Sequence, residues 1–249
     1  MESFSINTSN KVWILVLLTT FCLESDGEAQ DSVDQQRAAR RPKSFAIIFN
    51  YGYGSDQFPK DIEAFEKVAQ VAKSANFNVL LCKYDSARAQ VCKKLGLKIM
   101  VDLLVNDHHV YKNVESAKKL CESLRGNEVV FGYHLWSDNI GSTYSGRSRD
   151  VRNVQSWDDS HPCYVGSYRM SRVSRVENLD LLGYYDFHWK RGGHWGNLTK
   201  ASRSATSKNA RFFRYCEACP GRIGVGNYNR ALYTISTSVA FGLKGYLFH

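Results

Sequence analysis

The sequence predicts one α/β domain in which eight parallel strands alternate with helices and close into a (β/α)8 barrel. Short apolar runs, each of the length of a buried strand, recur along residues 44–249, and stretches with helical spacing separate them. The chain has 249 residues, of which 43% are hydrophobic, and this is enough for one sizeable core. Residues 44–249 are therefore expected to form a single barrel domain.

The alternation is clearest in the first half of this domain. Buried strands are expected at residues 44–50, 78–83, 98–104 and 128–135. Segments with helical spacing lie between them. Pro59 is placed to open the first helix, and Gly96 and Gly126 are placed to end the next two.

The second half repeats the pattern less regularly. Strands are expected at residues 163–168, 181–189, 211–216 and 245–249, and helices at 148–157, 198–205 and 228–243. No residue follows His249, so the barrel is expected to lack its last helix; a fragment of a longer chain and a barrel closed in another way are the two explanations left open. A doubly wound open sheet is the alternative, but Tyr51-Gly52-Tyr53-Gly54 lacks the third glycine of the dinucleotide-binding fingerprint.

The N-terminus has the layout of a signal peptide. Lys11 precedes the apolar residues 12–23, and a polar segment ending at Ala29 follows, so residues 1–29 are expected to be removed and Gln30 to begin the mature chain. The apolar run is too short to predict a membrane span, and no stable membrane anchor is expected. Lipidation at Cys22 is disfavoured because Phe21 stands where a small residue is usual. Residues 30–43 are polar and are predicted to be a linker.

Charge and cysteine content limit the partners. Residues 1–29 hold one basic and four acidic residues, so their removal would raise the formal net charge from +9 to +12. Such a charge favours anionic partners, and export favours an acidic glycan or an anionic surface over nucleic acid, although the charge could instead serve solubility. The remaining cysteines are scattered; an oxidising compartment would allow one or two disulfides, whose pairing the sequence does not determine.

The stretch from Phe131 to Asn139 changes from apolar to polar and aromatic. It reads Phe-Gly-Tyr-His-Leu-Trp-Ser-Asp-Asn, a buried strand that runs into Ser137, Asp138 and Asn139. In parallel barrels the chemistry lies on the loops that leave the C-terminal ends of the strands. An ordinary strand followed by an Asx turn would give the same pattern.

This stretch resembles the fourth-strand signature of clan A glycoside hydrolases, especially their β-galactosidase-like members. Tyr215-Cys216-Glu217 is similar to their seventh-strand nucleophile, and Thr237 to Gly245 is similar to the helix and turn before their eighth strand. The resemblance extends over most of residues 44–249 and implies hydrolysis of O-glycosyl bonds without a cofactor. It departs from the family at one position, because Asn139 stands where the acid/base Glu is expected.

Glycoside hydrolysis needs two carboxyl groups, and the resemblance supplies candidates for both. Glu217 is the candidate nucleophile. Asp138 is the nearest candidate for the acid, although a shift of one residue along a strand turns a side chain to the opposite face. Asp102 and Asp186 are alternative carboxyls. A capping role for Asp138 and a salt bridge for Glu217 remain open as structural interpretations.

Other polar and aromatic residues at the strand ends are expected to bind the ligand. The predicted substrate-binding residues are Asn139, Trp136, His134, Asp186, His188, Trp189 and Tyr51. Aromatic rings with polar rims suit the C–H face of a sugar. The histidines near the strand ends also allow a metal-dependent hydrolase, but they lack regular ligand spacing, so no metal is predicted. Two hypotheses therefore remain: a secreted or periplasmic glycoside hydrolase, and a non-catalytic glycan-binding barrel.

Overall fold

The chain is described here by a computed structural model. The described residues are 39–40, 42, 44–50, 57–104, 109–136, 144–167, 173, 175–185, 194–216 and 228–248. Within these ranges the side chains of 144, 145, 194, 228–232 and 234 are not described. The predicted signal peptide at residues 1–29 lies outside the described part of the chain.

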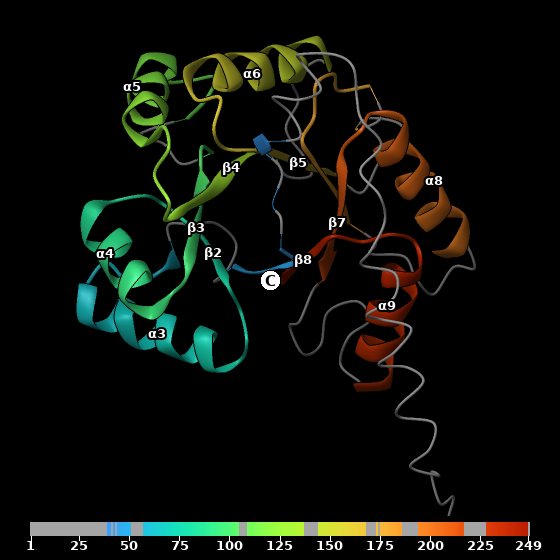
Figure 1. The fold of residues 1–249 in the computed structure, drawn as a ribbon, viewed down its shortest axis with the longest axis horizontal. Coiled ribbons are helices and arrows are strands. Elements are labelled where there is room, and N and C mark those ends of the chain that lie inside the picture. The colour runs from blue at the N-terminus through green and yellow to red at the C-terminus, as the bar shows by residue number, and fades with distance from the viewer. Residues whose placement is uncertain are drawn as a thin grey trace, which may run out of the picture. The chain divides into compact units, whose positions relative to one another are not determined.

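Eight parallel strands form a closed barrel, as the sequence predicts. The strands are β1 (Ala46–Asn50), β2 (Val79–Cys82), β3 (Lys98–Asp102), β4 (Val130–Trp136), β5 (Cys163–Ser167), β6 (Leu181–Tyr185), β7 (Arg211–Cys216) and β8 (Gly245–Phe248). Each begins within two residues of its predicted position. Closure comes from the pairing of β1 with β8, in which Ala46 lies opposite Gly245 (Figure 1). The alternative of an open sheet is therefore excluded.

Helices surround the strands in the described part of the barrel (Figure 1). They are α3 (Ile62–Ser74), α4 (Ser86–Leu95), α5 (Val114–Leu124), α6 (Tyr144–Trp157), α8 (His194–Ser207) and α9 (Tyr228–Ala240). Asp61 and Asp85 cap the N-termini of α3 and α4, and Gly96 ends α4 in the left-handed conformation. Among the described residues, no helix has the length and apolar character needed to cross a membrane.

The side chains of the strands form two separate apolar layers. One layer fills the barrel interior with Ala46, Ile48, Val79, Leu81, Met100, Phe131, Tyr164, Leu181, Phe213 and Leu247. The other packs the outer face of the sheet against the helices. Tyr164 crosses the interior above Gly183, where a Cβ atom would lie only 2.0 Å from the tyrosine hydroxyl oxygen. Glycine at position 183 therefore makes room for this central tyrosine.

Arg40 belongs to the stretch that the sequence predicts to be a linker, but its side chain is buried. A guanidinium nitrogen of Arg40 lies 3.4 Å from a carboxylate oxygen of Asp180, which stands just before β6. Asp180 also accepts hydrogen bonds from the Gln155 amide and from the backbone N–H of Cys163. This part of the predicted linker therefore packs onto the N-terminal ends of β5 and β6.

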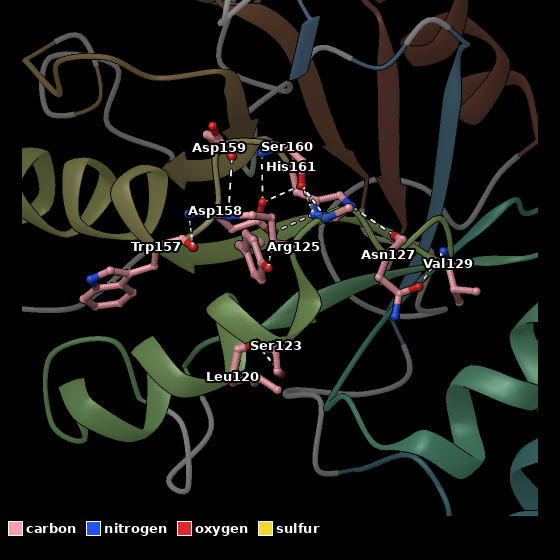
Figure 2. Close-up of polar contacts among 12 residues, drawn as sticks. Leu120, Ser123, Arg125, Asn127, Val129, Trp157, Asp158, Asp159, Ser160 and His161 are labelled. Carbon is pink, nitrogen blue, oxygen red and sulfur yellow. Dashed lines mark hydrogen bonds and ion pairs between the residues drawn. The ribbon is translucent and has the colours of Figure 1, made fainter.

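A buried polar cluster joins α6 to β5 at the N-terminal end of the barrel (Figure 2). The Asp158 carboxylate accepts hydrogen bonds from the hydroxyls of Tyr133 and Ser160 and from the backbone N–H of Ser160. His161 Nδ1 lies 2.7 Å from Asp158 Oδ2, and His161 Nε2 lies 3.0 Å from the carbonyl oxygen of Asn127. Both ring nitrogens of His161 therefore already have acceptors, and only the imidazolium form can donate to both.

The cysteines of the described residues are buried free thiols: Cys82, Cys92, Cys121, Cys163 and Cys216. The disulfides that the sequence allows are therefore absent among these five residues. Burial raises the pKa of Cys92 and Cys121 to about 12 and that of Cys216 to about 11. Because the thiolate is the reactive form, these side chains are held in an unreactive state.

Alkylation should test this burial directly. In a variant in which Cys22 and Cys219 are replaced by Ala, we expect iodoacetamide at neutral pH to label the native protein at least about 100-fold more slowly than the unfolded protein. Mass spectrometry of time points measures the rate at each cysteine. Rapid native-state labelling at any of the five described cysteines, or recovery of a disulfide between two of them, would contradict this description.

Candidate active site

The structure describes two of the predicted site residues, His134 and Trp136, both on β4. The other predicted site residues lie outside the described part of the chain: Glu217, Asp138, Asn139, Asp186, His188, Trp189 and Tyr51. The described geometry therefore concerns the ends of the strands that precede those residues in the sequence.

A buried histidine–carboxylate pair lies at the C-terminal ends of β3 and β4. Asp102 and His134 are opposite each other in the strand pairing, and His134 Nδ1 lies 3.0 Å from Asp102 Oδ1. Asp102 also accepts a hydrogen bond from the backbone N–H of Leu104. The two side chains are only 6% and 5% exposed. Asp102 therefore holds a proton on Nδ1 and fixes the orientation of the ring.

This pair faces the inside of the barrel. Met100, two residues before Asp102, belongs to the interior layer, and side chains alternate along a strand. The ring of His134 packs 5.5 Å from the ring of Tyr164, centroid to centroid, and Tyr164 also belongs to the interior layer. His134 Nε2 makes no hydrogen bond to any residue that the structure describes. Within the described residues, the imidazole of His134 is thus held through one nitrogen only.

Other polar groups extend the same end of the interior. The rings of Tyr185 on β6 and Tyr215 on β7 pack edge to face, with centroids 4.4 Å apart. Asn50, the last residue of β1, follows Ile48 in the inward row. Its side-chain oxygen is buried and accepts no hydrogen bond from the described residues. A buried acceptor of this kind suits a ligand hydroxyl.

Trp136 was expected to offer a ring face to a sugar, but the structure buries it completely. The ring of Tyr111 stacks on its indole, with centroids 5.1 Å apart and an interplanar angle of 9°, and the guanidinium of Arg147 lies 4.7 Å from the ring centroid. The indole is therefore covered by groups of the protein itself. The register shift between β4 and β5 beside His134 explains this position, because Leu135 and Trp136 both pack in the outer layer.

The groups around Trp136 are also titratable. Burial raises the pKa of Asp150 to about 6, although Arg149 and the indole N–H of Trp136 favour its charged form. That N–H makes no hydrogen bond of normal geometry within the described residues. Burial and the charge of Lys112 lower the pKa of His109. Trp136 thus packs among polar and charged side chains on the outer side of the C-terminal end of β4.

Metal ligands do not gather in the described part of the barrel. No group of three or more His, Cys, Asp or Glu side chains there is arranged to hold a metal ion. Of the histidines considered as ligands, His108, His188 and His249 lie outside the described residues. His109 packs edge to face on Tyr111, and His134 is paired with Asp102.

Solved structures show what this architecture resembles. A protein from Bacteroides thetaiotaomicron assigned as an α-L-fucosidase superposes with a TM-score of 0.59 at 8% identity, over 91% of this chain and 90% of its own. The glycoside hydrolase family 5 mannosidase of Rhizomucor miehei gives a TM-score of 0.57 at 11% identity, over 82% of this chain and 81% of its own. This chain therefore has the same barrel architecture as these two structures.

The likeness extends to other enzymes with this barrel. The HpcH/HpaI aldolase of Desulfitobacterium hafniense gives a TM-score of 0.54 at 10% identity, over 86% of this chain and 88% of its own. No protein-family model matches the sequence, and no curated protein matches it. Because unrelated reactions share this fold, the similarity shows the architecture, and the function has to be argued from the site.

Sequence reasoning named Asp102 as an alternative carboxyl but missed its pairing with His134. It also missed Asn50, Tyr164 and Tyr215 as groups of the barrel interior. Strand alternation carried a signal for the inward direction of Asn50 and Asp102. Each is a polar strand end that stands two positions after an apolar inward residue, Ile48 or Met100. Nothing local in the sequence indicated that Tyr164 would cross the interior above Gly183.

Proposed function

We propose that this barrel binds carbohydrate at the C-terminal ends of its strands and hydrolyses a glycosidic bond there. Glu217 is the proposed nucleophile, and Asp138 is the second carboxyl of the pair. Phe213 and Tyr215 belong to, or pack against, the interior layer, and we propose that Glu217 continues this inward row of β7. A β-galactosidase-like specificity is part of the proposal and rests on the sequence resemblance.

The Asp102–His134 pair is the observation that carries this proposal. The imidazole is buried and oriented, its Nε2 has no hydrogen-bonding partner among the described residues, and it lies where barrel enzymes place their chemistry. Several enzymes that act on glycosides share the fold. Asn139, Asp186, His188, Trp189 and Tyr51 are proposed to contact the sugar.

A non-catalytic glycan-binding barrel is the second candidate, and Asn139 favours it. In this alternative the amide stands in place of the acid/base carboxyl, so protonation of the leaving oxygen fails and binding remains. Both candidates bind carbohydrate, but only the first hydrolyses it. Export after cleavage at Ala29 and an anionic glycan are further parts of the proposal, supported by the N-terminal apolar run and by the basic net charge.

A paired screen on the purified chain from Gln30 onward should distinguish the two candidates. We expect turnover of at least one 2,4-dinitrophenyl glycoside from a panel of α- and β-linked mannose, fucose, glucose, galactose and glucuronic acid, together with binding on a glycan array. Glycan binding without any turnover would favour the binding barrel. Neither binding nor turnover would contradict the proposed function in both forms.

A further inference from the structure

The barrel contains two buried histidine–aspartate pairs, and their second ring nitrogens differ. At the N-terminal end, His161 uses Nδ1 toward Asp158 and Nε2 toward the Asn127 carbonyl, as Figure 2 shows. At the C-terminal end, His134 uses Nδ1 toward Asp102, but its Nε2 has no hydrogen-bonding partner among the described residues. Both ring nitrogens of His161 thus have partners, whereas His134 is held through Nδ1 alone as far as the described residues show.

His134 Nε2 belongs to a ring that cannot easily rotate. Asp102 accepts from His134 at 3.0 Å and is itself held by the backbone N–H of Leu104 at 3.0 Å. The ring of Tyr164 packs against the imidazole, and Gly183 leaves room for that tyrosine. A carboxylate on Nδ1 keeps the proton there and makes Nε2 the atom that gains or loses a proton.

We propose that His134 is the proton donor of the glycosidic reaction, with Asp102 as its positioning residue. This inference rests on the proposed function and assigns to an imidazole the role that Asp138 holds in the simpler scheme. An amide at position 139 carries no proton that it can donate to a leaving oxygen, so a different acid is required. The sequence resemblance does not indicate this assignment, because it places the acid beyond the end of β4.

The proposed reaction takes place in two steps. In the first step, the bond between the anomeric carbon and the leaving oxygen breaks, the Glu217 carboxylate bonds to that carbon, and the Nε2 proton moves to the leaving oxygen. In the second step, water attacks the anomeric carbon, the bond to Glu217 breaks, and a water proton returns to Nε2. Asp102 stays ionised and stabilises the imidazolium that exists before and after each turnover.

Leaving-group dependence tests this assignment, because 2,4-dinitrophenolate leaves without a proton and an alkoxide does not. The test uses the sugar that the screen identifies, as its dinitrophenyl and its methyl glycoside. We expect His134→Gln to reduce kcat on the methyl glycoside about 10²–10⁴-fold and on the dinitrophenyl glycoside less than about 10-fold. Asp102→Asn should show the same selective loss to a smaller degree.

His161→Gln is the matched control, because it removes the other buried histidine–aspartate pair. Its stability should fall, as measured by thermal unfolding, while the ratio of the two kcat values stays that of the unmodified protein. Asp138→Asn should likewise leave the ratio unchanged. An equal loss on both substrates for His134→Gln, or a selective loss for Asp138→Asn, would overturn the assignment and leave the proposed hydrolysis intact. Absence of turnover by the unmodified protein on every glycoside would overturn both the assignment of His134 and the proposed hydrolysis.

Discussion

Replacing Glu217 by Gln is expected to reduce turnover on the dinitrophenyl glycoside by on the order of 10⁴-fold or more. The amide has nearly the same shape as the carboxylate but cannot attack the anomeric carbon, so the covalent step of a retaining mechanism is lost. Initial rates with the purified variant give this number, and titration with the glycan identified on the array gives its affinity. We expect the affinity to change by less than about 10-fold, because the sugar contacts remain.

Glu128→Gln is the control for this substitution. Glu128 is 75% exposed and pairs with Lys93 just before β4, far along the strand from the proposed site. Removing the charge of Glu128 should leave turnover within about twofold, because exposed ion pairs contribute little. If turnover survived both Glu217→Gln and Asp138→Asn, the chemistry would have to lie elsewhere in the barrel.

The largest expected effect on stability is that of Asp158→Ala. This carboxylate is fully buried and accepts hydrogen bonds from Tyr133, Ser160 and His161, so its removal takes away the partner of a buried tyrosine hydroxyl and of one nitrogen of a buried histidine ring. We expect a loss of about 3–5 kcal/mol in the free energy of unfolding. Urea denaturation followed by tryptophan fluorescence measures this change.

Asp159→Ala is the neighbouring control for that experiment. Asp159 is 63% exposed and lies 3.5 Å from Arg125, an exposed pair from which we expect less than about 1 kcal/mol. Comparable losses for Asp158→Ala and Asp159→Ala would show that the polar cluster in Figure 2 is not a buried network.

The same cluster predicts a dependence of stability on acid. Burial alone would raise the pKa of Asp158, but the hydrogen bonds from His161, Ser160 and Tyr133 outweigh burial and hold the pKa well below its ordinary value. A lowered native pKa means that the stabilisation is complete above the unfolded value, about pH 4, and is lost as the pH falls below it. Asp158→Asn should therefore flatten the fall in stability below pH 4.

The sequence by itself determined where the strands begin and where some of the strands and helices end. Apolar runs placed eight strands within two residues of their observed starts, because burial of both faces of a parallel strand leaves a continuous local signal. Gly96 ended its helix as predicted, because glycine adopts the left-handed conformation readily. The change from apolar to polar residues after Trp136 likewise marked the C-terminal end of β4.

Only the tertiary structure decided which side chains meet. His134 touches Asp102, 32 residues away, because β3 and β4 pair in a register that includes a shift near Met100. A second shift beside His134 moves Trp136 into the outer layer, so the alternation of side chains cannot be extended from His134 to Asp138. Hydrophobic periodicity is a local property of the chain, whereas register and bulges arise from contacts between strands. That is why the strands could be predicted from the sequence and the histidine–aspartate pair could not.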